Sequence, residues 1–215
     1  MQNRSTIYPI IAREGWPIIG AGVVVTLAFW ILDWELLAFL ALVFTAFSLN
    51  FFRDPVRPEP QDPRDIVSPV DGRVCKVQKA VNPETGEEAI QISIFMNVFD
   101  VHSQKAPVAG VIEKITYTPG LFLSADLDKA STDNERNAVT VRMADGRRVT
   151  FIQVAGLVAR RILCHAAVGE TLRRGERYGF IRFGSRVDVY LPPEAEVKCV
   201  IGEKVAGVLS TIARL

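Results

Sequence analysis

Two long uncharged segments near the N-terminus constrain this chain more than any other feature. Trp16–Leu32 and Leu36–Phe52 each contain 17 residues without a charged side chain, and only the three residues 33–35 separate them. A helix needs roughly 17–25 apolar residues to span the hydrocarbon core of a bilayer. We therefore predict an N-terminal hydrophobic two-helix hairpin, residues 1–52, that lies in a membrane.

The charges that flank this hairpin predict its orientation. Arg4 and Arg13 precede the hairpin, Arg53 and Arg57 follow it, and the connecting turn is acidic. Because Lys and Arg collect on the cytoplasmic side of membrane segments, both ends are expected in the cytoplasm, with the hairpin in the cell (inner) membrane. Two alternatives stay open, namely a buried helical pair in a soluble core and a hairpin that enters only one leaflet.

A change of composition marks the next boundary. Residues 53–66 mix four prolines with charged side chains, which predicts a stiff polar linker. Beyond the linker, residues 67–215 are rich in segments with a two-residue period and β-branched side chains, separated by turn-forming residues. The expected strands are Arg73–Val81, Ala89–Met96, Ala138–Met143, Arg148–Val154, Val187–Leu191 and Glu196–Ile201. This pattern predicts a mainly β catalytic domain, a β-sandwich or barrel, with helices expected only at Leu157–Cys164 and Leu121–Lys129.

Composition excludes several classes of function. A net charge of +1 argues against a nucleic-acid partner, although residues 142–186 hold ten arginines against three carboxylates and predict a surface that attracts anions. Three widely spaced cysteines and only two histidines, His102 and His165, provide no metal-binding motif, so no metal site is expected.

Three short segments supply an acid, a base and a hydroxyl group: Ser68–Arg73, Asn97–His102 and Phe183–Asp188. With three further segments in the same order they resemble the phosphatidylserine decarboxylases, in the short bacterial and archaeal form. The segments that carry this resemblance are Phe51–Pro55, Ser68–Gly72, Asn97–His102 followed by Pro107–Gly110, Asn134–Asn137, Ala155–Arg161 and Phe183–Ser185.

The resemblance implies a proenzyme that cuts its own backbone between Gly184 and Ser185, giving a β chain (1–184) and an α chain (185–215). Ser185 would attack the Gly184 carbonyl and become a pyruvoyl group, the covalent cofactor that forms a Schiff base with the substrate. His102 is the implied base and acid, and Asp71 would orient its ring as in a catalytic triad. The implied reaction converts phosphatidylserine, an anionic phospholipid, into phosphatidylethanolamine and CO2.

One position departs from part of the family, since Phe99 stands where some long-form members carry a second histidine. That leaves open which group donates the proton during decarboxylation. Two other functions stay open: an archaetidylserine decarboxylase of the same family and a membrane-anchored serine hydrolase that uses Ser185, His102 and Asp71. A third class, a carrier module, would need a lysine on a tight hairpin, which the sequence does not offer. A higher oligomer of the two-chain unit is also compatible with the sequence.

Overall fold

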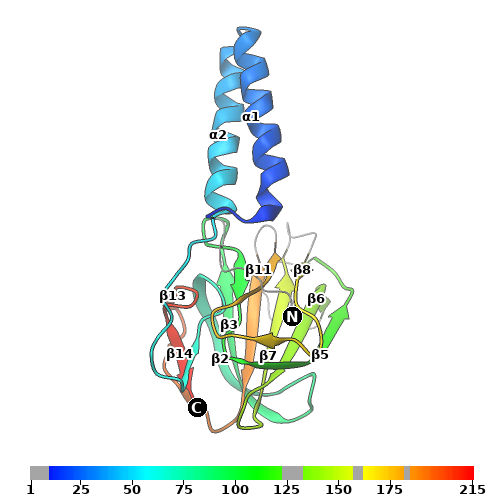
Figure 1. Cartoon of the computed structure of the whole chain (residues 1–215), viewed down its shortest axis with the longest axis vertical. Coiled ribbons are helices and arrows are strands. Elements are labelled where there is room, and N and C mark those ends of the chain that lie inside the picture. Colours follow the sequence, from blue (N-terminus) through cyan, green and yellow to red (C-terminus); the bar gives the residue numbers. More distant parts are fainter. Residues whose placement is uncertain (1–9, 123–132, 157–161, 182–184) are drawn as a thin grey trace. The chain divides into compact units, whose positions relative to one another are not determined.

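The computed structural model describes residues 10–122, 133–156, 162–181 and 185–215. The chain divides into two compact units, Met1–Val56 and Arg57–Leu215 (Figure 1). The division falls inside the proline-rich segment that the composition identified at 53–66.

The first unit is a helical hairpin. A 3₁₀ turn at Arg13–Gly15 leads into α1 (Trp16–Ile31), and α2 (Glu35–Phe51) runs beside it (Figure 1). The helices approach closely at Gly22, where a Cβ atom would lie 2.5 Å from Oγ1 of Thr45. Thr45 itself donates its hydroxyl to the carbonyl of Ala41 one turn earlier, so its polar group is satisfied within its own helix.

Large apolar side chains cover the outside of this hairpin. Val24, Trp30, Leu36 and Phe39 are 60–70% exposed, and many of their neighbours on both helices are similarly open. Arg13–Ile31 is long and apolar enough to cross a membrane, whereas Glu35–Phe51 is an apolar helix of 17 residues. Contiguous apolar surface of this extent is typical of segments that contact lipid or another apolar surface.

The second unit is built from strands, as the two-residue period predicted. Its strands are β1 (Asp65–Val67), β2 (Gly72–Val81), β3 (Glu88–Met96), β4 (Ser103–Lys105), β5 (Gly110–Thr118), β6 (Arg136–Arg142), β7 (Arg148–Ala155), β8 (Ile162–Cys164), β9 (Thr171–Leu172), β10 (Arg177–Ile181), β11 (Ser185–Leu191), β12 (Glu196–Val197), β13 (Lys204–Val205) and β14 (Thr211–Arg214). The mainly β fold with an N-terminal helical hairpin is therefore confirmed.

Eight of these strands form one antiparallel sheet, here called the main sheet, in the order β13-β2-β3-β11-β7-β6-β5-β9 (Figure 1). A second sheet, here called the cover sheet, has the order β4-β10-β8, and a third has the order β1-β14-β12. The main and cover sheets pack through a core in which the rings of Phe151 and Tyr178 lie 4.6 Å apart. β11 thus lies near the middle of the main sheet, between β3 and β7.

Two expectations for local structure were wrong. Leu157–Cys164 was expected as a helix, but Ile162–Cys164 forms β8, and the remainder lies outside the described residues. Glu196–Ile201 was expected as one strand, but only Glu196–Val197 is extended, because a turn at Val200–Gly202 returns the chain toward β13. The expected helix at Leu121–Lys129 falls largely outside the described residues.

Candidate active site

Ser185 is the first residue of β11 and is fully buried. Its backbone is paired on both sides, with Met96 of β3 and with Ala155 of β7. Within the described part of the chain, its Oγ makes no hydrogen bond. A buried hydroxyl without such a bond is costly in a folded protein, and a catalytic role is one reason for which such a group is kept. Gly184, the expected partner in the cleavage, lies outside the described residues.

His102 is also fully buried, and it follows Met96 by only six residues. Its Nδ1 lies 2.9 Å from the carbonyl oxygen of Asp100. A carbonyl oxygen can only accept a hydrogen bond, so Nδ1 must carry the proton. The neutral ring therefore has its lone pair on Nε2, the nitrogen that a general base would use.

The conformation of the loop before His102 places the Asp100 carbonyl where it can accept the hydrogen bond from Nδ1 of His102. Asn97 accepts a hydrogen bond from the backbone N–H of Phe99 through its side chain, at 2.8 Å. Asp100 in turn accepts one from the backbone N–H of Asn97, at 2.9 Å. Such turns, closed by Asn and Asp side chains, fix the backbone of short loops. The same loop leaves the Phe99 side chain 66% exposed.

Asp71 does not contact His102 in the described structure. Its carboxylate forms an ion pair with Arg57, in which Nη2 lies 2.8 Å from Oδ2 and Nη1 contacts Oδ1. It also accepts the backbone N–H of Gly207 at 2.8 Å. The tautomer of His102 is therefore fixed by the Asp100 carbonyl, where the triad analogy had assigned that task to Asp71.

The segment around Asp71 nevertheless lies at the same edge of the main sheet as Ser185. β2 begins at Gly72, directly after Asp71, and β3 alone separates β2 from β11. The Pro69 carbonyl accepts the backbone N–H of Lys105, three residues after His102. The three segments that supply acid, base and hydroxyl therefore lie at the same end of the strands of the main sheet.

Three buried amide side chains lie beside this edge, and the sequence pointed to only one of them, Asn137, within the segment Asn134–Asn137. Asn137 donates to Gln153 (Nδ2 to Oε1, 2.9 Å), and Gln153 donates to Gln104 (Nε2 to Oε1, 2.8 Å). Gln104 then donates through Nε2 to the backbone carbonyl of His102, at 2.9 Å. Polar residues inside otherwise apolar strands were the available signal for this chain of hydrogen bonds.

Two further polar groups in this layer stay protonated at neutral pH. Burial raises the pKa of the Cys164 thiol, and it raises the pKa of the Tyr178 hydroxyl well above its ordinary value. His165, the second histidine, is exposed on the segment that follows β8.

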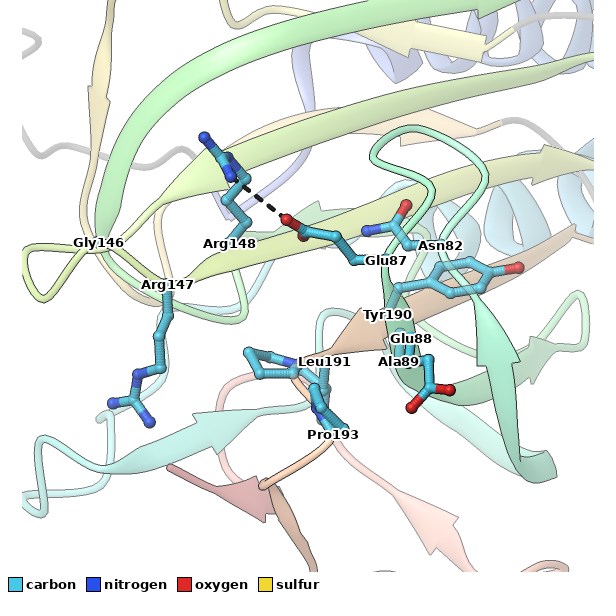
Figure 2. Close-up of a pocket in the computed structure, with 11 residues that line it drawn as sticks. Asn82, Glu87, Glu88, Ala89, Gly146, Arg147, Arg148, Tyr190, Leu191 and Pro193 are labelled. Atoms are coloured by element: carbon cyan, nitrogen blue, oxygen red, sulfur yellow. Dashed lines mark ion pairs between the residues drawn. The ribbon is translucent and has the colours of Figure 1, made fainter.

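A cavity of about 300 Å³ lies elsewhere on the main sheet (Figure 2). It is lined by Tyr190 and Leu191 at the end of β11, six residues or roughly 20 Å along the strand from Ser185. Arg148 in its wall is 2.7 Å from Glu113 and 3.5 Å from Glu87, so its charge is already balanced (Figure 2). This pocket is therefore separate from the edge that holds Ser185.

Comparison with known proteins gives the family of this chain. Residues 44–209 match the family model described as phosphatidylserine decarboxylase. A phosphatidylserine decarboxylase proenzyme of Neisseria gonorrhoeae (strain NCCP11945) is 58% identical over 214 residues, which are 99% of this chain and 82% of the relative. Proenzymes of the same name from Ralstonia nicotianae and Cupriavidus taiwanensis are 54% and 53% identical, over 99% and 97% of both chains in each pair. The chain therefore belongs to the phosphatidylserine decarboxylase family.

Proposed function

We propose that this chain is a self-processing carboxy-lyase that converts phosphatidylserine into phosphatidylethanolamine and CO2. The observation that carries the proposal is the buried Ser185 hydroxyl, which makes no hydrogen bond to the described residues and stands at the first position of a central strand. Membership of the decarboxylase family supports the reaction type, since relatives at 53–58% identity are named as proenzymes of this enzyme.

Self-processing would take place between Gly184 and Ser185. The Ser185 Oγ attacks the Gly184 carbonyl carbon and the peptide C–N bond breaks, giving an ester and a free amino group on Ser185. A base removes the Cα proton of Ser185, and the ester C–O bond breaks, so Gly184 leaves as a carboxylate and a dehydroalanine forms. Addition of water and loss of NH3 leave a pyruvoyl group at the start of the α chain.

His102 is the proposed base for these proton transfers. With its proton held on Nδ1 by the Asp100 carbonyl, the ring has Nε2 free of a proton, as a base requires. Acid–base catalysis by a positioned side chain contributes about 10²–10⁴-fold to a rate. Asp71 is proposed to assist processing from its ion pair with Arg57, without a direct contact to the ring.

The residues present fit a pyruvoyl group made from Ser185. The strand that carries it is paired with Met96 and Ala155, so the new chain end would stay at the same place in the sheet after the cut. When formed, the group supplies a carbonyl that accepts the electron pair left by the loss of CO2. The chain's own task is then to hold the headgroup and to move a proton at Nε2 of His102.

Membrane association follows from the substrate, which is a lipid. We propose that the hairpin anchors the enzyme in the inner membrane with the catalytic unit on the cytoplasmic side. The arginines at both ends of the hairpin and the acidic turn between its helices support this orientation. The exposed apolar surface of α1 and α2 supports the anchoring.

The test is the intact mass of the denatured full-length protein, compared with Ser185→Ala and with Ser93→Ala. Ser93 is an equally buried serine on β3, so its variant controls for the loss of a buried hydroxyl. Wild type and Ser93→Ala should give fragments 1–184 and 185–215, the smaller lighter by one NH3 than a peptide that starts with serine. Ser185→Ala should give one chain and produce no phosphatidylethanolamine.

Other masses would contradict the proposal. A wild-type chain that stays intact and yet reacts at Ser185 with a serine-directed phosphonate would favour a hydrolase instead. Cleavage of Ser185→Ala at the same position would remove Ser185 from the reaction.

A further inference from the structure

We propose that Gln104 and Gln153 are positioning residues that hold His102 at the correct distance from β11. This inference rests on the proposed function, in which His102 is the base for Ser185. The evidence is the directional chain of amide hydrogen bonds that begins at Asn137 and ends at the backbone of His102.

The two reactive side chains belong to different sheets, which creates the need for such a connection. Ser185 begins β11 in the main sheet, whereas His102 directly precedes β4 in the cover sheet. Apolar packing between sheets is not directional, so it sets their separation less sharply than hydrogen bonds do. A misplacement of about 1 Å between reacting groups can lower a rate by 10²-fold.

The hydrogen bonds between the amide side chains connect the main sheet to the cover sheet, on the face of the main sheet that also bears Ser185. Gln153 lies on β7, two residues before Ala155, which pairs with Ser185. Its Nε2 bonds to Gln104 of β4 at 2.8 Å and lies 3.3 Å from the Leu163 carbonyl of β8. Because successive side chains alternate between faces, Gln153 and Ser185 lie on the same face of the main sheet.

A glycine leaves room for this crossing. Gly179 on β10 pairs with both Gln104 and Cys164. A Cβ atom at this position would lie 2.6 Å from Nε2 of Gln153 and 3.2 Å from Oε1 of Gln104. Glycine inside a strand is unfavourable in itself and often marks such a close approach. The cover sheet is thus shaped to let the two amides meet.

The chemistry of the amides assigns them a positional role. Amide side chains do not titrate in the range where an enzyme works, so they cannot serve as acid or base. Gln153 and Gln104 are fully buried, as is His102, so each of their bonds is made away from water. Fixing the His102 carbonyl and the Nδ1 proton together fixes both the backbone and the ring.

The test measures self-cleavage of the full-length chain, made by cell-free synthesis with phospholipid vesicles and followed over time on denaturing gels. Gln104→Met and Gln153→Met keep the side-chain length and remove the hydrogen bonds of the side-chain amide. Both should cleave at least tenfold more slowly than wild type at pH 8.

Gln91→Met is the matched control. Gln91 is buried and accepts a hydrogen bond from the amide of Gln78 at 2.9 Å, on the opposite face of the main sheet. The control should stay within twofold of wild type.

Gln153→Glu separates positioning from general stability. When protonated, the glutamate can accept from Asn137 and donate to Gln104, as the amide does, but its ionised form has no proton to donate. Burial raises the pKa of a carboxyl group, so both forms are accessible in a practical pH range. The ratio of the Gln153→Glu rate to the wild-type rate should rise at least fivefold from pH 8 to pH 5.5. Resistance to trypsin at each pH checks that the variant is folded.

The outcomes separate this inference from the proposed function. If His102→Ala is blocked while both methionine variants cleave within twofold of wild type, positioning by the amides is wrong and the function stands. If His102→Ala cleaves at the wild-type rate, His102 is not the base and the positioning inference falls, whereas the cleavage at Ser185 is still tested separately by Ser185→Ala. Should the methionine variants fail to fold, a pH-independent ratio for Gln153→Glu would overturn the inference by itself.

Discussion

His102 depends on a backbone group for its chemistry. The carbonyl of Asp100 holds the proton on Nδ1, and that carbonyl is held by a loop closed through the side chains of Asn97 and Asp100. In a serine hydrolase triad a carboxylate performs the same task. A carbonyl offers no negative charge, so it orients the ring while doing less to stabilise the charged imidazolium.

Replacement of His102 by alanine should therefore slow self-cleavage by about 10²–10⁴-fold, the range that a positioned acid or base supplies. The measurement is the fraction of intact chain over time after synthesis of the full-length protein. His165→Ala is the matched control, since His165 is exposed and should leave the rate unchanged. Normal processing of His102→Ala would remove the residue from the role of base.

The contributions of Asp71 and Arg57 to the rate of self-cleavage can be distinguished by comparing single variants. Asp71→Asn removes the charge of the carboxylate, and we expect it to slow cleavage. Arg57→Met leaves that charge in place and removes its ion-pair partner, together with the hydrogen bond from Nη1 of Arg57 to the Gly207 carbonyl. If Asp71 acts through its own charge, Arg57→Met should cleave within threefold of wild type while Asp71→Asn is at least tenfold slower. Equal slowing of both variants would instead mean that the pair matters only as an anchor for the start of the catalytic unit.

These residues differ in how far the sequence could reveal them. Ser185, His102 and Asp71 belong to short segments whose resemblance to a family was visible. The contact of His102 with the Asp100 carbonyl was not predictable, because every residue has a carbonyl and only the loop conformation selects this one. Gln104 and Gln153 lie 49 positions apart on strands of different sheets, so no local pattern joins them.

β11 is the strand on which both the fold and the proposed reaction depend. It begins at Ser185, and it pairs with β3 on one side and β7 on the other. On the face opposite to Ser185 it bears a buried ion pair, in which Nε of Arg186 lies 2.8 Å from Oδ1 of Asp188, and both side chains are 1% exposed. Breaking a buried pair by removing one partner costs far more than replacing both, because a single charge is then left without its partner.

We expect Asp188→Asn to destabilise the protein by roughly 3–5 kcal/mol, and Arg186→Met/Asp188→Leu to recover most of that loss. The measurement is the urea midpoint of the full-length protein in detergent, in the Ser185→Ala background so that only uncleaved chain is compared. Arg147→Met, which breaks the exposed pair with Asp145, should change stability by less than about 1 kcal/mol. A small loss for Asp188→Asn would show that water reaches the pair.

The strands that sequence reasoning missed have identifiable physical reasons. In β5 the pairing with β6 shifts between Ile112 and Lys114, so the alternation of apolar and polar residues is interrupted. β10 has Gly179 in the middle of its five residues, and a glycine there argues against a strand in the sequence. In the structure this glycine leaves room for the side chain of Gln153 to reach Gln104. β7 and β11 pair with their neighbours without such a shift, and both were predicted.

The proposed cut leaves a 31-residue α chain whose strands pair with strands of the β chain. It contains β11 in the middle of the main sheet, β13 paired with β2, and β14 paired with β1. Short chains of this size do not form a core alone. Fragments 1–184 and 185–215 should therefore co-elute in gel filtration in mild detergent and separate only in denaturant, whereas separation in detergent alone would contradict this account.

The depth of the hairpin in the bilayer can be measured at the turn between its helices. If α1 and α2 span the membrane, the turn between them is on the outside, and the catalytic unit is in the cytoplasm. Glu35→Cys, at the start of α2, should then react with a membrane-impermeant maleimide added to cells whose outer membrane has been permeabilised. Cys75 is a native control in the same molecule, since it is exposed on the catalytic unit and should react only after lysis. Labelling at position 35 only after lysis would place the hairpin in one leaflet, because a helix pair that turns inside the bilayer keeps its tip away from the outer face.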